Sequence, residues 1–180
     1  MSAKISLLPT HYAFKLLQSC LGVPKLISIL RCFPCHNLPE LNEIDTILKG
    51  ILEKVLNIQL NETKWIQASL PTRLGGLGFR SSNQLAIPAY LSSFCEALKQ
   101  LPSLPISIEF EQNYNIMNSS ISKEIPDFSQ RTIDHAICKS KYKTFVNSFD
   151  AKEKSRIMSA SHKFSGDWLK LYLMINLDYF

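Results

Sequence analysis

The chain has 180 residues, 46% of them hydrophobic, so it can bury the core of one domain and does not belong to the disordered class. Its net charge of +5 is a mild basic excess, compatible with nucleic acid or an acidic surface as partner but proof of neither. Five scattered cysteines, an odd number, argue against a disulfide framework. Much of the positive charge lies between Arg131 and Lys163, where eight basic residues face three acidic ones.

The longest apolar stretch, from Leu16 to Phe33, is interrupted by Lys25 and Arg31. A membrane-spanning helix needs roughly 20 predominantly apolar residues, so we expect no membrane span and no membrane partner. With no signal peptide recognisable in the sequence, we expect an intracellular protein. The sequence does not decide between nucleus and cytoplasm.

Apolar residues recur at helical spacing through most of the chain, and the sequence therefore predicts an all-α fold. The clearest pattern runs over 41–56, with apolar residues three and four positions apart. Pro24 fits the first turn of a helix, while Asn61 and Asp150 are suitable N-cap residues, the latter with Glu153 in a capping-box pattern. The predicted helices cover 11–21, 24–33, 41–56, a short segment after Asn61, 83–101 with a kink or break at Pro88, 130–149 and 150–162.

Three of the six glycines, Gly75, Gly76 and Gly78, lie close together inside an apolar run. Glycine is unfavourable within a helix and accepts backbone conformations with positive φ, so we expect these residues to form a tight, buried structural loop. Pro71 ends the preceding helix, and the serine pair at 81–82 is suited to cap the next. The glycine spacing fits neither a Walker phosphate loop nor a dinucleotide-binding fingerprint.

The residues around this loop follow the pattern W-x-Q-A-x-L-P-x-R-x-G-G-L-G-x-R, from Trp65 to Arg80. This pattern resembles the region that follows the polymerase core in non-LTR, LINE-like retrotransposon reverse transcriptases. Shorter matches lie upstream, at residues 23–25 and 30–31, and downstream, at residues 165–169. The resemblance covers most of the chain and has least support between about residues 100 and 130.

The resemblance implies that residues 1–101 form a thumb-like helical region, 102–129 a linker, and 130–180 a smaller C-terminal helical part similar to the family's connector. In that family the thumb grips the template and primer duplex beside the palm. The chain would then be a noncatalytic C-terminal fragment of an RNA-directed DNA polymerase, with RNA or DNA backbone and the missing polymerase domains as partners. The rival interpretation is a helical protein-interaction module, or a remnant without selected function.

The sequence offers no catalytic residues. Two-metal polymerase chemistry needs carboxylates that converge on the metal ions, and the resembled family supplies them partly through an aromatic-x-Asp-Asp turn. This chain has no Asp-Asp pair, and its aspartates are dispersed at positions 45, 127, 134, 150, 167 and 178. We therefore expect no enzyme activity, no metal site and no cofactor.

The segment from Cys32 to His36 spells C-x-x-C-H, the string that attaches c-type haem in exported proteins. No signal peptide is recognised, and a structural zinc site needs four ligands where this string supplies three. We interpret Cys32 and Cys35 as ordinary residues beside a helix end, and we keep haem or zinc binding as outlying alternatives.

Two sets of basic residues are candidates for contacts with a nucleic-acid backbone. Arg73 and Arg80 flank the glycine loop and are placed to contact phosphates; alternatively, the loop serves close packing and the arginines pair with carboxylates or carbonyls. Lys139 and Lys143 share one face of a predicted helix, with Lys141 on another. The alternative for these lysines is a solvated, lysine-rich helix. We favour the second interpretation of both sets, and keep Arg73, Arg80, Lys139 and Lys143 as the candidate binding residues.

Overall fold

The computed structural model describes residues 5, 7–100, 112, 115, 129–162 and 164–165. All regular structure within these residues is helical, so the all-α prediction is confirmed. The α-helices are α2 (Thr10–Leu16), α3 (Ile27–Cys32), α4 (Pro39–Leu56), α5 (Glu62–Ser69), α6 (Ser82–Gln100), α8 (Gln130–Asn147) and α9 (Ala151–Ala160). Three short turns join them: the π-helical η1 (Leu17–Leu21) and the 3₁₀ turns η2 (Val23–Lys25) and η3 (Thr72–Leu74).

The first predicted helix is continuous but changes its winding. α2 passes directly into the π-helical turn η1, and Gly22 ends the helix with its amide bonded to the carbonyl of Leu17 at 2.9 Å. Pro24 lies in η2, which leads into α3, so the second predicted helix is observed as a 3₁₀ turn followed by a short α-helix.

One stretch of the described chain, Thr10–Cys32, is long and apolar enough to cross a membrane by length and composition. Signal sequences and core helices of globular proteins satisfy the same criterion. The expectation of no membrane partner therefore stays a prediction.

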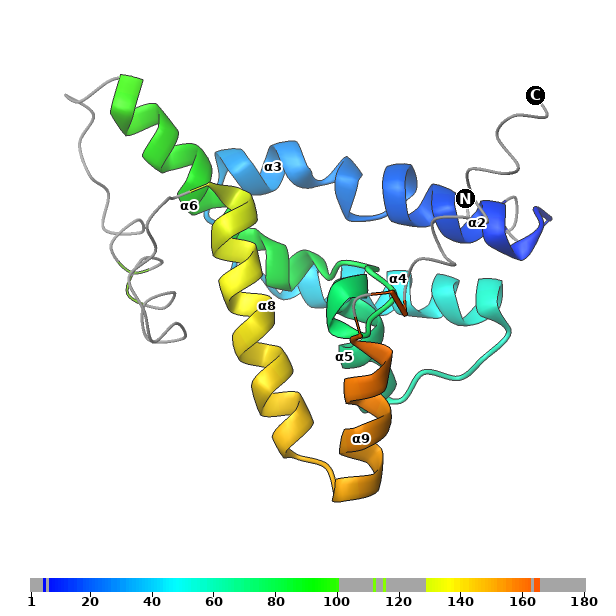
Figure 1. The fold of residues 1–180 in the computed structure, drawn as a ribbon. Helices are drawn as coiled ribbons and strands as arrows, with labels where there is room; N and C mark the ends of the chain where they lie inside the picture. The colour runs from blue at the N-terminus through cyan, green and yellow to red at the C-terminus, as the bar shows by residue number, and fades with distance from the viewer. Residues whose placement is uncertain are drawn as a thin grey trace.

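The largest hydrophobic core forms around α4 (Figure 1). α4 begins at Pro39, and its C-cap is Asn57, whose φ of 52° places it in the left-handed conformation common at helix ends. Each fully buried Leu or Ile contributes about 1.5–3 kcal/mol relative to an exposed one, so α4 is a major source of stability. The buried side chains of α4 are Leu41, Asp45, Leu48, Ile51, Leu52 and Val55.

A buried carboxylate on α4 caps the start of α6. Asp45 is only 8% exposed, and it accepts hydrogen bonds from the Ser81 hydroxyl, from the Ser82 amide and hydroxyl (both 2.7 Å), and from the Asn83 amide (3.3 Å). A carboxylate here satisfies free amides and interacts favourably with the helix dipole. The Ser81 hydroxyl also accepts from the Gln84 amide, as predicted for a cap. Asp45 thus ties the beginning of α6 to α4.

α6 continues through Pro88 to Gln100, so the break predicted as one alternative at this proline is absent. Pro88 is fully buried, as are its neighbours Ala89 and Leu91. Proline removes one amide donor from a helix, and here the helix persists because this section is packed in the core.

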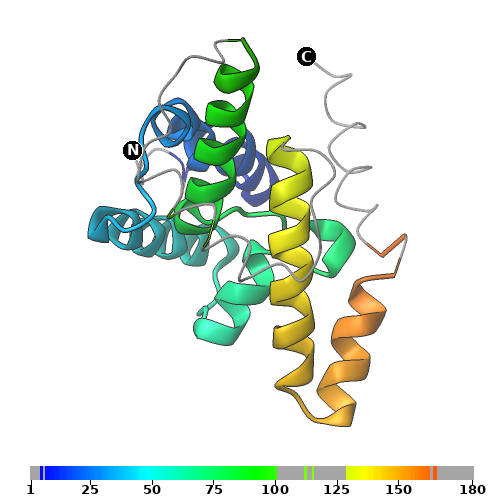
Figure 2. The same cartoon turned by 90° about the vertical axis from the view of Figure 1, so that its left-hand side faces the viewer.

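α8 and α9 form an antiparallel hairpin that projects from the other helices (Figures 1 and 2). Both helices begin with side-chain caps: Ser129 accepts from the Thr132 amide at 3.3 Å, and Asp150 from the Glu153 amide at 3.0 Å, the latter as predicted. The Glu153 carboxylate pairs with Arg156, so only half of the predicted capping box is formed. Two small cores anchor the hairpin, one with α6 (Tyr90, Leu91 and Ile133) and one with the chain after α5 (Leu70, Phe145, Val146 and Ile157).

The predicted linker at 102–129 lies almost wholly outside the described residues, and the segment 166–180 lies wholly outside them. The division into 1–101 and 130–180 therefore stays a prediction. On either side of the linker the chain is in contact: Arg31 in α3 donates two hydrogen bonds, of 3.1 and 2.8 Å, to the side-chain oxygen of Gln130 at the start of α8.

Candidate nucleic-acid interface

The glycine loop folds back onto the end of α5. The Gly78 amide donates to the Leu70 carbonyl at 2.8 Å, and the amides of Leu77 and Phe79 both donate to the Ala68 carbonyl at 3.2 Å. These bonds satisfy carbonyls that the end of a helix leaves free. The loop is thus held by hydrogen bonds to the last carbonyls of the preceding helix and to the Leu70 carbonyl that follows it.

The three glycines are needed for two different reasons. Gly75 and Gly78 have φ of 74° and 68°, in the region that favours glycine. At Gly76 an added Cβ would lie 2.1 Å from the Leu70 carbonyl oxygen and 2.5 Å from that of Gln67. Since both atoms belong to the backbone, no side-chain movement would make room.

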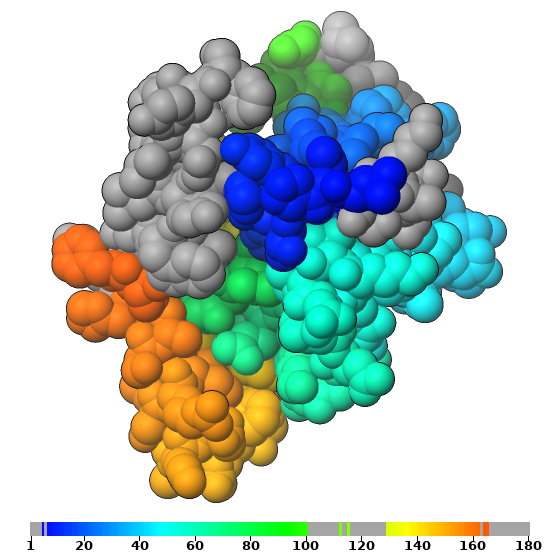
Figure 3. Space-filling model, turned by 90° about the vertical axis from the view of Figure 1, so that its right-hand side faces the viewer, coloured from blue at the N-terminus to red at the C-terminus, as the bar shows by residue number. Residues whose placement is uncertain are grey.

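The loop also contacts elements from both ends of the chain. A Cβ at Gly75 would lie 3.2 Å from backbone atoms of Ala160 and Ser161 at the end of α9. From η1, the Gln18 side-chain amide donates to the Leu77 carbonyl at 3.1 Å. Figure 3 shows green atoms, from the part of the chain that includes α5 and α6, between the orange α9 and the cyan surface of α4. Its position makes the loop a junction for the flanking arginines.

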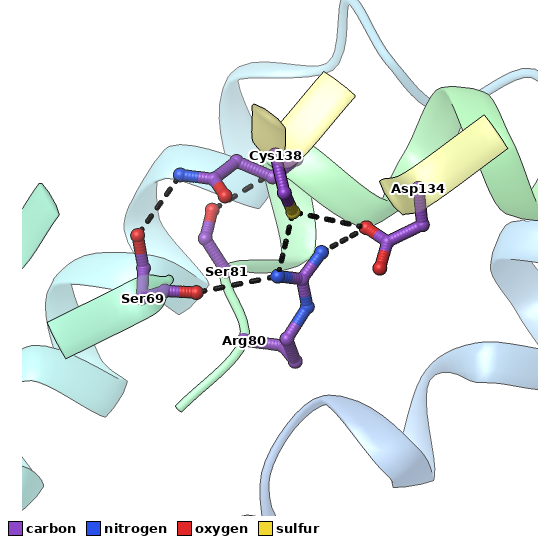
Figure 4. A network of polar contacts seen from close by, with 6 residues as sticks. Ser69, Arg80, Ser81, Asp134 and Cys138 are labelled. Carbon is purple, nitrogen blue, oxygen red and sulfur yellow. Dashed lines mark hydrogen bonds and ion pairs between the residues drawn. The ribbon is translucent and has the colours of Figure 1, made fainter. Parts of the chain in front are cut away.

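Arg80 points into this junction (Figure 4). One guanidinium nitrogen donates to the Ser69 carbonyl at 3.3 Å and to the Cys138 sulfur at 3.0 Å, and another donates to the Asp134 carboxylate. The side chains of Arg80 and Asp134 are 20% and 21% exposed. Burial raises the pKa of the Cys138 thiol, which keeps it neutral beside the ion pair. Arg80 thus joins the loop to α8, as expected from the alternative in which an arginine pairs with a carboxylate and a carbonyl.

Arg73, in η3, has the opposite environment. It is exposed, and within the described residues its side chain forms no hydrogen bond or ion pair. It nevertheless lies close enough to His135 on α8 for its charge to act on the imidazole. The two candidate arginines therefore differ. Arg80 forms hydrogen bonds and an ion pair inside the molecule, whereas Arg73 faces solvent beside α8.

A line of basic residues follows one side of α8. Arg131, His135, Lys139 and Lys143 are spaced four residues apart, so each lies about 6 Å further along the helix than the one before. The three cations are exposed and His135 is half-buried. We call these four residues, together with Arg73, the basic stripe. In the part of the chain that the structure describes, none of the stripe's four cations pairs with a carboxylate.

The charges of the stripe converge on His135. Partial burial lowers the pKa of its imidazole, and the nearby charges of Arg73, Lys139 and Arg131 lower it further, while Asp134 acts in the opposite direction. An imidazole has an ordinary pKa of about 6.5, so His135 is neutral at pH 7. Burial is the largest cause of this lowered pKa, and the neighbouring cations of the stripe add to it.

Lys141 lies on a different face of α8 from Lys139 and Lys143, as predicted. It lines a cleft of about 530 Å³ whose other walls come from α4, α5 and the start of α6, including Asp45 and Trp65. Trp65 itself packs against the main core, with its ring 6.1 Å from that of Phe79 in an edge-on arrangement.

The C-x-x-C-H string places its residues in unlike environments. Cys32 is exposed, whereas Cys35 is buried and its burial raises the pKa of its thiol. Burial lowers the pKa of His36, and both of its ring nitrogens are buried without a hydrogen-bond partner. Over the described residues, no group of three or more His, Cys, Asp or Glu side chains is arranged to hold a metal ion. The interpretation of Cys32 and Cys35 as ordinary residues beside a helix end stays a prediction, with haem and zinc binding as its outlying alternatives.

The described aspartates of the helical elements each have a structural partner. Asp45 caps α6, Asp134 pairs with Arg80, and Asp150 caps α9. Sequence reasoning missed the first two roles, because both partners are distant in the chain. It also left Arg131 and His135 out of the candidate binding residues, although their four-residue spacing from Lys139 and Lys143 was a readable signal.

Comparisons of the chain with protein-family models, curated proteins and solved structures gave no match. The resemblance to non-LTR reverse transcriptases therefore stays an expectation from the sequence pattern.

Proposed function

We propose that this chain is a noncatalytic fragment of a retrotransposon-type RNA-directed DNA polymerase, and that its basic stripe binds the phosphate backbone of RNA or DNA. One observation carries the binding proposal. Exposed cations without acidic partners among the described residues follow one side of α8, and Arg73 of η3, beside the glycine loop, lies close to them. The sequence pattern from Trp65 to Arg80 supports the polymerase origin.

The physical basis is electrostatic. A lysine or arginine that neutralises a phosphate releases condensed counterions, which makes binding favourable at low salt and progressively weaker as salt is added. The stripe suits a polyanion with regularly spaced charges, because its residues recur about every 6 Å on a helix of fixed geometry. Arg80 contributes indirectly, since its bonds to Asp134 and Cys138 hold α8 against the loop that carries Arg73.

Fluorescence anisotropy with a labelled RNA–DNA hybrid tests the proposal, with titrations from low to physiological salt. The test variant is Lys139→Gln with Lys143→Gln, and the matched control is Lys25→Gln with Lys54→Gln, two exposed lysines on η2 and α4. We expect the test variant to bind about tenfold more weakly, and the slope of log affinity against log salt to flatten by about 1.8 for two lost phosphate contacts. The control should stay within about twofold of the unaltered chain.

Two results would overturn the binding proposal: no binding at low salt, or equal losses in the test and control variants. Thermal or urea unfolding of both variants checks that the fold is intact. Since all four lysines are exposed, the free energy of unfolding should change by less than about 0.5 kcal/mol.

The alternative, a helical protein-interaction module, is favoured by a separate observation. In α3 and in the segment that joins it to α4, Ile29, Phe33 and Leu38 are 52%, 63% and 48% exposed, and exposed apolar surface can mark an interaction site. On this alternative, sedimentation velocity would show association that increases with concentration, persists in high salt and is lost in Ile29→Ser with Phe33→Ser. A monomer at all concentrations would count against self-association.

A further inference from the structure

His135 occupies the centre of the basic stripe, and its surroundings set what its protonation does. It lies one helical turn after Arg131 and one before Lys139, with Arg73 facing it from η3. Its half-buried position separates it from the exposed cations on either side. A proton on this imidazole would therefore add a fifth positive charge to the middle of the stripe.

Among the charged groups of the described residues that act on His135, Asp134 is the only carboxylate. Asp134 lies toward the interior, accepts a hydrogen bond from the Arg80 guanidinium and is its ion-pair partner. Its negative charge is thus largely compensated by Arg80, while Arg73, Arg131 and Lys139 have no such compensation within the described chain. In the free protein, the balance around His135 disfavours the protonated imidazole.

A bound polyanion reverses that balance. Phosphates placed along the stripe neutralise Arg73, Arg131 and Lys139, and they add negative charge close to the imidazole. Both changes favour protonation of His135. By linkage, a group that gains a proton on binding makes the complex more stable as the pH falls.

We propose that His135 takes up a proton when the stripe binds a nucleic-acid backbone, so that the chain holds RNA or DNA more tightly in mildly acidic than in neutral solution. This inference rests on the proposed function and adds a regulatory property to the same site.

Anisotropy titrations of the unaltered chain with the labelled RNA–DNA hybrid, at constant salt between about pH 7.5 and 5.5, test it. The affinity should rise about threefold to tenfold over this interval, since each unit of pKa change on binding corresponds to a factor of about ten. His135→Gln should lose most of this rise, measured as the ratio of its own affinities at the two pH values. His162→Gln is the matched control, because it removes an exposed histidine at the end of α9, and it should keep the full rise.

Calorimetry in two buffers of different ionisation enthalpy gives a second readout. At about pH 6.5, binding to the unaltered chain and to His162→Gln should be accompanied by uptake of a substantial fraction of a proton, which His135→Gln should not show. Binding of equal strength at every pH, or the same rise in His135→Gln, would overturn the inference and leave the proposed function standing. No binding at any pH would overturn both.

Discussion

The two sides of α8 use charge in opposite ways. On the inner side, Asp134 and Cys138 receive the guanidinium of Arg80, and the resulting contacts hold the helix against the glycine loop. On the outer side, the cations of the basic stripe are exposed and unpaired within the described residues. Residue type alone therefore does not determine what a charged side chain does. Arg73 and Arg80 flank the same loop, yet Arg73 belongs to the outer side of α8 and Arg80 to the inner side.

The largest predicted effect comes from a substitution in the glycine loop that supports the inner side of α8. Gly76→Ala places a Cβ against two backbone carbonyl oxygens, at 2.1 and 2.5 Å, so we expect a loss of about 3 kcal/mol in the free energy of unfolding. Gly50→Ala is the control, because a Cβ at this helical position has nothing within 4 Å. It should stabilise the chain by about 0.5–1 kcal/mol. Urea unfolding measures both, and equal effects would contradict the packing argument.

The next largest effect is expected when the inner ion pair is removed. Arg80→Ala leaves the Asp134 carboxylate largely buried and without its partner, which should cost about 2 kcal/mol in the free energy of unfolding. Arg156→Ala removes a partner of Glu153 that is 72% exposed, and should change stability by less than about 0.5 kcal/mol. Combining Arg80→Ala with Asp134→Ala should restore part of the loss. A double variant whose losses simply add would show that the two side chains are not coupled.

Next in size is the effect expected on stability from removing the charge of the carboxylate that caps α6. Asp45→Asn keeps the shape but removes the charge that four donor groups share, and should cost about 1–2 kcal/mol. Asp150→Asn, at the exposed cap of α9, should stay within about 0.5 kcal/mol because Asn is also a good N-cap. Chemical unfolding at pH 7 compares the two, and a larger loss in Asp150→Asn would contradict the importance given to the buried cap.

The smallest predicted effect is a pH dependence from the outer side. In the folded state the pKa of His135 lies below its unfolded value of about 6.5. Below about pH 6.5 the unfolded chain therefore binds more protons than the folded chain, and the stability decreases as the pH decreases. Between about pH 7.5 and 5.5, the unaltered chain should lose stability relative to His135→Gln. Urea midpoints of both chains at the two pH values give the comparison. A parallel change in both would mean that His135 does not sense the stripe.

Features that depend on local chemistry could be predicted from the sequence. The apolar spacing over 41–56 located α4, the glycine cluster located the tight loop, and Asn61 and Asp150 cap the helices that they precede. In each case the local sequence suffices to place the element, although α4 and the loop are then buried against distant parts of the chain. The four-residue spacing on α8 belongs to this class too, although only Lys139 and Lys143 were picked out.

Features that depend on distant partners could not be predicted. Asp45 and Ser81 are 36 positions apart, and Arg80 and Asp134 are 54 apart. Nothing in the local sequence distinguishes Arg73 from Arg80, because their environments differ only once α8 has packed against the loop. The choice between a phosphate-binding and a structural arginine is therefore made by tertiary packing.

The contacts of α8 also suggest that the helix stays in place without a covalent link to the first part of the chain. The helix is joined to α3 through Gln130, to α6 through the core around Ile133, and to the loop through Asp134, and none of these contacts uses residues 102–128. Two fragments made by cutting the chain in that interval would carry complementary surfaces. They should reassemble on mixing, and the dissociation constant of the pair would measure directly how strongly the hairpin is held.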